Sequence, residues 1–137
     1  MQTILLLWTI RAAFVLYLTS IVAWRLRRDQ MARALWTLGC ALYLVHVAAA
    51  FQFVHHWSHD AAYRETARQT AALFGWNWGG GIYFNYLFTL IWIVDAAWWQ
   101  RGLSAYRGRP RSIAIGVDVF FAFMFFNAIV FAVYRAI

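Results

Sequence analysis

The chain has 137 residues, of which 64% are hydrophobic and 20% aromatic, and its 12 arginines against 5 acidic residues give a net charge of +7. A soluble domain has about a quarter of its residues charged, whereas this chain has 12%. That composition excludes a soluble globule and makes the lipid bilayer the expected solvent. The single cysteine, Cys40, excludes an intramolecular disulfide and a thiolate cluster for zinc or iron–sulfur.

Four apolar segments follow one another along the chain, at residues 3–24, 34–57, 82–99 and 113–134. Each is close to the ~20 residues that cross ~30 Å of hydrocarbon as a helix. They are too long for the strands of a membrane barrel and do not alternate polar with apolar residues. The sequence therefore predicts an all-α membrane protein, with one four-span domain over residues 1–137 and its helices in an up-down bundle.

The connection between the second and third segments predicts a short extramembrane helix over residues 61–74. Asp60 can cap its start and Gly75 suits its end. Apolar residues recur at steps of three and four, which suits a helix that lies on the membrane or caps the bundle. Gly79 to Gly81 then predict a flexible turn, and Pro110 ends the last connection.

The charges of the connections predict the orientation. Residues 25–33 sum to +3 and residues 101–111 to +4, whereas residues 58–81 sum to zero. The positive-inside rule puts the arginine-rich connections in the cytoplasm, and both termini and the 58–81 loop outside. Interfacial tryptophans are expected at Trp8, Trp57, Trp76 and Trp78 on the outer side and at Trp24, Trp36, Trp98 and Trp99 on the inner side. A bacterial inner membrane, with anionic lipids at the inner face, is the expected location.

All four histidines lie within fourteen positions at the outer end of the second segment. His55 and His59 are an i, i+4 pair, and with His56 they share one side of a continuous helix. Such spacing can bind copper, zinc or iron, or support a haem b. A helix break at Ser58 or Asp60 would move His59 off this stripe. The alternatives are interfacial histidines bonded to Asn or Tyr, and a proton relay.

Further polar residues within the spans are candidates for binding a cofactor. Arg11 lies roughly 12 Å below the outer surface and should have a partner: Asn127, Asn85, a backbone carbonyl, a lipid phosphate or a cofactor carboxylate such as a haem propionate. His46, Asn85 and Tyr86 join Arg11 as candidate cofactor-binding residues. Asn85 and Tyr86 would either orient metal-bound imidazoles or join two spans.

Asp95 and Asp118 lie at similar depth near the inner ends of the last two spans. We expect them to face each other or to pair with arginines of the inner connections, among them Arg25, Arg27, Arg101 and Arg111. Such a group is either an inner ion-pair cluster or an entry point for a proton or cation.

Two functions follow from these residues. The first is a small integral membrane protein that binds a transition metal or haem through its histidines, in redox or metal handling. The second is a non-catalytic accessory subunit that packs against a larger membrane complex, with a homo-oligomer as a variant. The net positive charge is explained by topology, so a nucleic-acid partner is not expected, and the chain lacks the phosphate-loop, haem-attachment and nucleophile-elbow motifs.

Overall fold

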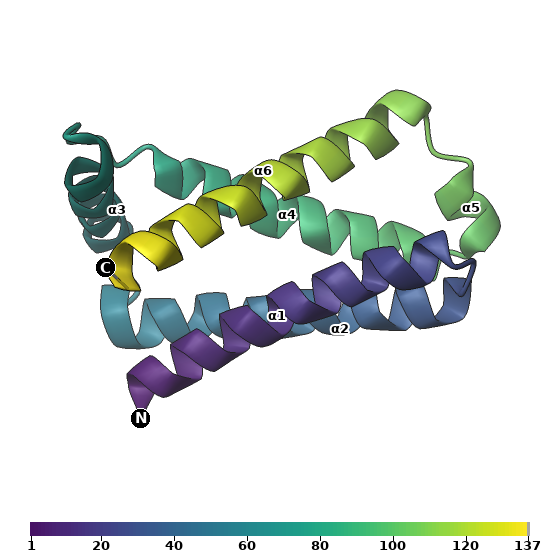
Figure 1. Cartoon of the computed structure of the whole chain (residues 1–137), viewed down its shortest axis with the longest axis horizontal. Coiled ribbons are helices and arrows are strands. Elements are labelled where there is room, and N and C mark those ends of the chain that lie inside the picture. Colours follow the sequence, from purple (N-terminus) through teal and green to yellow (C-terminus); the bar gives the residue numbers. More distant parts are fainter. Residues whose placement is uncertain (137) are drawn as a thin grey trace. The chain divides into compact units, whose positions relative to one another are not determined.

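The protein is described by a computed structural model that covers residues 1–136 and the side chains of residues 1–133. The elements in chain order are α1 (Gln2–Arg25), α2 (Asp29–Ala50), the π-helix η1 (Phe51–His55), α3 (His59–Phe74), α4 (Gly81–Gln100), α5 (Leu103–Arg107) and α6 (Arg111–Ala136) (Figure 1). No strand occurs among the described residues. Four helices, namely α1, α2 continued by η1, α4 and α6, are long and apolar enough to cross a membrane. The all-helical class and an integral membrane location are confirmed.

The chain divides into two compact units. The first contains Met1–Trp57 and Trp92–Gly108, and the second contains Ser58–Ile91 and the chain from Arg109 onward. Helix α4 contributes its first half to the second unit and its second half to the first. The up-down order of the spans and the single four-span domain stay predictions.

Small residues bring α1 and α2 close together in the first unit. Ala13, Ser20 and Ala32 are buried, and Ser20 Oγ donates to the carbonyl oxygen of Ala32 at 2.8 Å. A Cβ atom at Gly39 would lie only 3.1 Å from the Trp92 ring, so this glycine sets how closely α4 approaches α2. Close approach through small residues is the usual way in which membrane helices associate.

Seven aromatic residues pack against one another in the core of the first unit, all buried except Trp24, which is half-buried: Tyr17, Trp24, Trp36, Tyr43, Trp92, Trp99 and Tyr106. Trp36 and Trp99 are buried, with 5% and 3% of their surface exposed. Both rings therefore pack in this core, and the depth expected for them at the inner membrane interface stays a prediction. Trp99 stacks on Tyr106 with centroids 4.2 Å apart.

Phenylalanines join α4 and α6 in the second unit. The ring of Phe88 lies 4.6 Å from Phe121 and 5.7 Å from Phe125, and all three side chains are buried. The glycines before α4 serve close packing, because a Cβ atom at Gly79 would overlap the backbone oxygen and ring of Tyr63 on α3. The flexible turn that the sequence suggested at these glycines is thus a tightly packed segment.

Helix α3 begins two residues earlier than expected. Ser58 is its N-cap, since Ser58 Oγ accepts from the amide of Ala61 at 3.2 Å, and Asp60 instead pairs with Arg64 at 2.6 Å. Its end is as predicted: Gly75 adopts a φ of 70° and its amide bonds to Ala71. That α3 lies outside the membrane stays a prediction.

Helix α2 begins five residues before the predicted start of the second span at residue 34. The helix starts at Asp29, whose carboxylate suits the positive end of a helix dipole. Helix α5, within the last connection, was also not predicted, because five residues are too few for a recognisable period.

Candidate functional site

The second span ends in a turn that contains His56. After η1, His56 and Trp57 adopt left-handed conformations with φ of 50° and 58°. Such a conformation costs a residue other than glycine about 1–2 kcal/mol. Contacts of Trp57 offset part of this cost, because its indole nitrogen donates to Gln52 Oε1 at 2.9 Å and its ring lies 5.8 Å from that of Phe51.

This turn separates the histidines that the sequence placed on one helical stripe. His55 is the last residue of η1 in the first unit, whereas His59 is the first residue of α3 in the second unit. The continuous helix through His59 is therefore a wrong prediction, since the left-handed residues interrupt the helical hydrogen bonds. The interruption begins at His56, two residues before Ser58. The i, i+4 geometry on which the metal site depended does not exist.

The ring of His59 lies between two tyrosines of α4. Its Nδ1 is 2.9 Å from the Tyr86 hydroxyl oxygen, and its Nε2 is 3.3 Å from that of Tyr83. A neutral imidazole has one N–H donor and one lone pair, so one nitrogen donates to a tyrosine and the other accepts from one. The lone pair that a metal ion needs is thereby used. This arrangement agrees with the alternative of histidines bonded to tyrosine.

Tyr83 was missed as a partner of His59, and Tyr86 was expected either to orient metal-bound imidazoles or to join two spans. A signal was present in the sequence, because Tyr83 and Tyr86 are three residues apart and share a face of α4. Asn85 lies between them, exposed, and its backbone oxygen accepts from Thr89 at 2.8 Å.

His46 links α2 to α1. Its Nδ1 lies 3.0 Å from the carbonyl oxygen of Leu6 and 3.2 Å from Thr9 Oγ1. A carbonyl oxygen only accepts, so the proton between His46 and Leu6 belongs to Nδ1. The Thr9 hydroxyl donates to the carbonyl of Leu5 at 2.7 Å. His46 therefore donates one hydrogen bond between helices, and its lone pair is on Nε2.

Arg11 is exposed on α1, and its guanidinium lies 5.9 Å from the ring centroid of Trp8, one turn earlier. The asparagines proposed as its partners belong to the second unit. Asn127 donates its amide to the carbonyl of Phe123 on its own helix at 2.8 Å. The contact that the structure gives Arg11 is thus a cation–π contact within α1.

Asp95 has a partner that the sequence analysis did not name. It is 3% exposed and accepts a hydrogen bond from the Tyr106 hydroxyl at 2.8 Å. A buried carboxylate needs such a donor, and Tyr106 comes from α5, the helix that was not predicted. Asp118 belongs to the second unit, in which it is exposed on α6.

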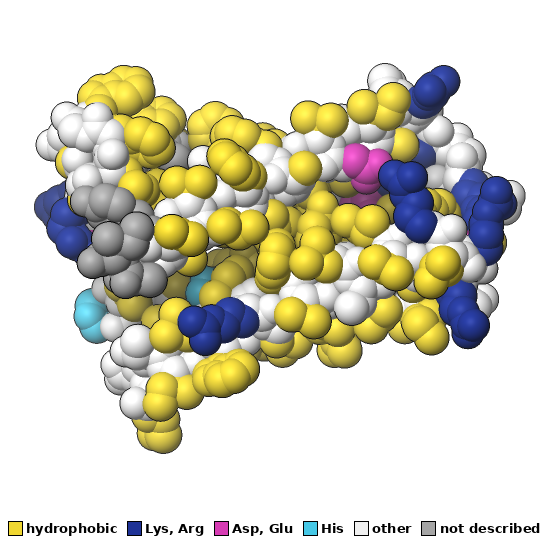
Figure 2. All heavy atoms as spheres, in the orientation of Figure 1, with side chains coloured by type: hydrophobic (Ala, Val, Ile, Leu, Met, Phe, Trp, Pro, Cys, Tyr) yellow, Lys and Arg dark blue, Asp and Glu magenta, His cyan; other side chains and the backbone are white. Residues whose placement is uncertain are grey.

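Arginines gather around the α1–α2 turn and α5 (Figure 2). An open pocket of about 410 Å³ is lined there by Trp24, Arg25, Arg27 and Arg107, all of the first unit. Arg107 pairs with Asp29 at 2.9 Å. This ion pair joins α5 to the first residue of α2 within the first unit.

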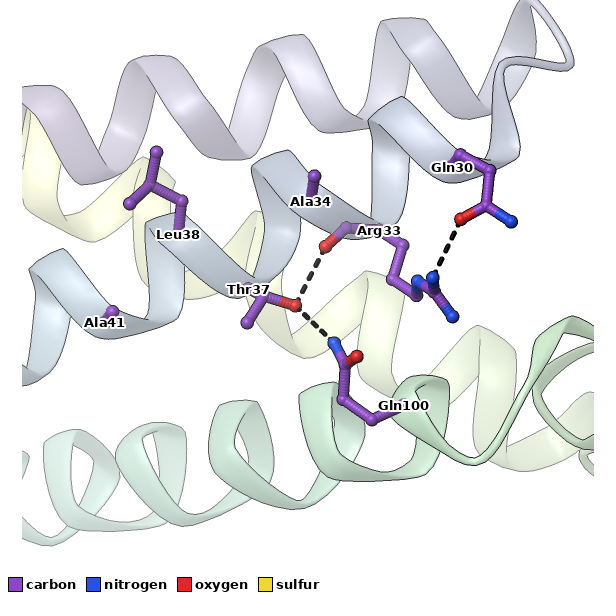
Figure 3. A pocket seen from close by; sticks show the side chains of 7 residues that line it. All are labelled: Gln30, Arg33, Ala34, Thr37, Leu38, Ala41 and Gln100. Carbon is purple, nitrogen blue, oxygen red and sulfur yellow. Dashed lines mark hydrogen bonds between the residues drawn. The ribbon is translucent and has the colours of Figure 1, made fainter.

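A second open pocket, of about 480 Å³, runs along α2 and reaches Gln100 of α4 (Figure 3). Its polar side chains bond to one another: Arg33 Nη2 donates to Gln30 Oε1 at 2.8 Å, and Gln100 Nε2 donates to Thr37 Oγ1 at 2.7 Å. Its other lining residues are Ala34, Leu38 and Ala41. These hydrogen bonds explain how the side chains are held in the groove.

The donor set does not fit the metal centre that the sequence suggested. No group of three or more His, Cys, Asp or Glu able to hold a metal ion occurs within the described part of the chain. The proposed site of His55, His56 and His59 is therefore unsupported. Comparison with protein-family models, curated proteins and solved structures gives no match to this chain.

Proposed function

We propose that the chain is a non-catalytic subunit that packs through α1 against a helix of a larger membrane complex. The observation that carries the proposal is Arg11, a charged residue exposed within a membrane-spanning helix. Two of the histidines, which suggested chemistry, bind other parts of the same chain: His46 bonds to Leu6 and His59 to Tyr86.

The exposed face of α1 has the spacing of a helix–helix seam. Its members recur at alternating steps of four and three residues, and all are exposed: Ile4, Trp8, Arg11, Val15, Leu18 and Val22. Alternating steps of four and three define the apolar seam of a left-handed helix pair. The buried residues of α1, among them Ala13 and Tyr17, lie on the opposite side. The seam therefore faces away from α2.

The position of Arg11 in this seam favours an acidic partner. Arg11 is nine residues from the start of α1, which is about 14 Å along a helix axis. An arginine near the centre of a span raises the free energy of membrane insertion by about 2.5–3.5 kcal/mol. An exposed cation–π contact offsets only about 0.5–1 kcal/mol of this cost. A carboxylate on the facing helix, at the depth of Arg11, would offset the remainder.

A photo-crosslinking residue at Val15 in intact host membranes tests this proposal. We expect a discrete protein adduct whose partner carries Asp or Glu within a span. Arg11→Leu should abolish the adduct and Arg11→Lys should retain it, because lysine keeps the charge. Leu38, 52% exposed on α2, is the matched control position and should give lipid adducts. Lipid adducts alone from Val15 would assign Arg11 to a lipid phosphate and contradict the proposal.

Ligation of a haem iron or a transition metal by His46 is a second candidate function. It is supported by one observation, the Nδ1 hydrogen bond to Leu6, because metal-bound histidines usually donate their other ring nitrogen to a carbonyl or carboxylate. The test is absorption and metal analysis of the purified protein. A Soret band or bound metal that is lost in His46→Ala and kept in His59→Ala supports this candidate. Absence of both signals from the unaltered protein contradicts it.

A further inference from the structure

We propose that the pocket lined by Trp24, Arg25, Arg27 and Arg107 binds a phosphate group, carried either by an anionic phospholipid or by a soluble phosphate. The pocket lies within the first unit, at the end of α1 where the arginine-rich connections meet. Its volume of about 410 Å³ falls within the usual range for ligand pockets, roughly 300–1,000 Å³. The proposal does not depend on a partner subunit.

The α1–α2 turn holds Arg27 at the pocket. The amide of Arg27 bonds to the Trp24 carbonyl at 3.2 Å, and that of Arg28 to the Ala23 carbonyl at 2.9 Å. This pair of bonds is a Schellman motif, whose left-handed position is usually glycine. Here Arg27 occupies it with a φ of 58°, at a cost of about 1–2 kcal/mol. An arginine at a position that favours glycine indicates that its side chain has a use.

Arg107 is fixed from two sides. Its guanidinium donates to Asp29 at 2.9 Å and lies 5.0 Å from the ring centroid of Trp24. Trp24 in turn meets Trp99 edge to face, with centroids 5.1 Å apart, and Trp99 stacks on Tyr106. A cation that is held in place before binding loses less conformational entropy when a ligand arrives.

The charges of the pocket suit an anionic phosphate group. Three guanidinium groups line the pocket, and Asp29 balances only Arg107, so an excess of positive charge remains. A guanidinium group can donate two parallel hydrogen bonds to two oxygens of one phosphate. Trp24 adds an amphipathic ring of the kind found at headgroup depth, and basic pockets beside membrane helices bind anionic headgroups.

Native mass spectrometry of the full chain in neutral detergent micelles tests the proposal. Phosphatidylglycerol, phosphatidylcholine with the same acyl chains, and inorganic phosphate are added in separate titrations. We expect one phosphatidylglycerol per chain and no such adduct with phosphatidylcholine. Arg27→Gln should weaken binding about ten-fold, the loss of one charged hydrogen-bonding group. Arg101→Gln, outside the pocket but with the same charge change, should bind as the unaltered chain does.

Arg27→Gly separates binding from folding. Glycine suits the left-handed position, so this variant should unfold at a higher temperature and still lose binding about ten-fold. Displacement of phosphatidylglycerol by inorganic phosphate only at great excess assigns the site to a lipid. Binding of inorganic phosphate without competition by phosphatidylglycerol assigns it to a soluble phosphate. Failure of both to bind, or equal losses in Arg27→Gln and Arg101→Gln, overturns the proposal.

Discussion

Replacing His56 with glycine tests whether the turn between η1 and α3 is held against backbone strain. With a φ of 50°, His56 bears a cost of about 1–2 kcal/mol that glycine avoids. Glycine also makes the unfolded chain more flexible, which lowers the free energy of unfolding by about 0.4–1 kcal/mol. We therefore expect His56→Gly to stabilise the protein by about 0.5–1 kcal/mol, which raises the melting temperature by roughly 3 °C in a chain of this size.

Thermal unfolding in neutral detergent micelles, followed by near-UV circular dichroism, measures this shift. His56→Ala is the matched control, because it removes the same imidazole but keeps the strain, and it should give no stabilisation. Trp57→Gly relieves a similar strain, at a φ of 58°, but loses the hydrogen bond to Gln52. It should therefore destabilise the protein. Equal destabilisation by His56→Gly and His56→Ala would refute the reasoning and show that the imidazole itself holds the turn.

Three further predictions concern packing, the buried carboxylate and orientation. Gly39→Val should destabilise the protein by about 1–3 kcal/mol, because a Cβ atom there meets Trp92 at 3.1 Å, whereas Gly116→Ala, with open space around it, should be neutral or stabilising in the same melts. Tyr106→Phe should cost about 1–3 kcal/mol, since the buried carboxylate loses a donor at 2.8 Å, and no change in the melt would show that the bond is dispensable. In a chain whose Cys40 has been replaced, a cysteine introduced at Arg68 should react with an impermeant maleimide in intact cells. Reaction only after lysis would reverse the predicted orientation.

The sequence by itself determined the number and nature of the spans. Their length and apolar composition are local properties, and a helix in lipid must satisfy its own backbone, so α1, α2, α4 and α6 follow directly. The end of α3 was also predictable, because Gly75 suits a left-handed cap. The cap predicted at its start, Asp60, is wrong, because Ser58, two residues earlier, also has a side chain that accepts from backbone amides and forms the cap instead.

Only the tertiary structure decided how the polar residues are used. Hydropathy could not place Trp36 and Trp99 in a core, because lipid tails are as apolar as a protein interior and both environments select the same residue types. The partner of Asp95 comes from α5, and the partners of His59 lie 24 and 27 residues further along the chain. The sequence shows that Tyr83 and Tyr86 share a face of α4, but no local pattern predicts that His59 is the residue which they contact. The left-handed turn at His56 had no signature in the sequence either, since the contacts of Trp57 that offset part of its cost form only in the folded chain.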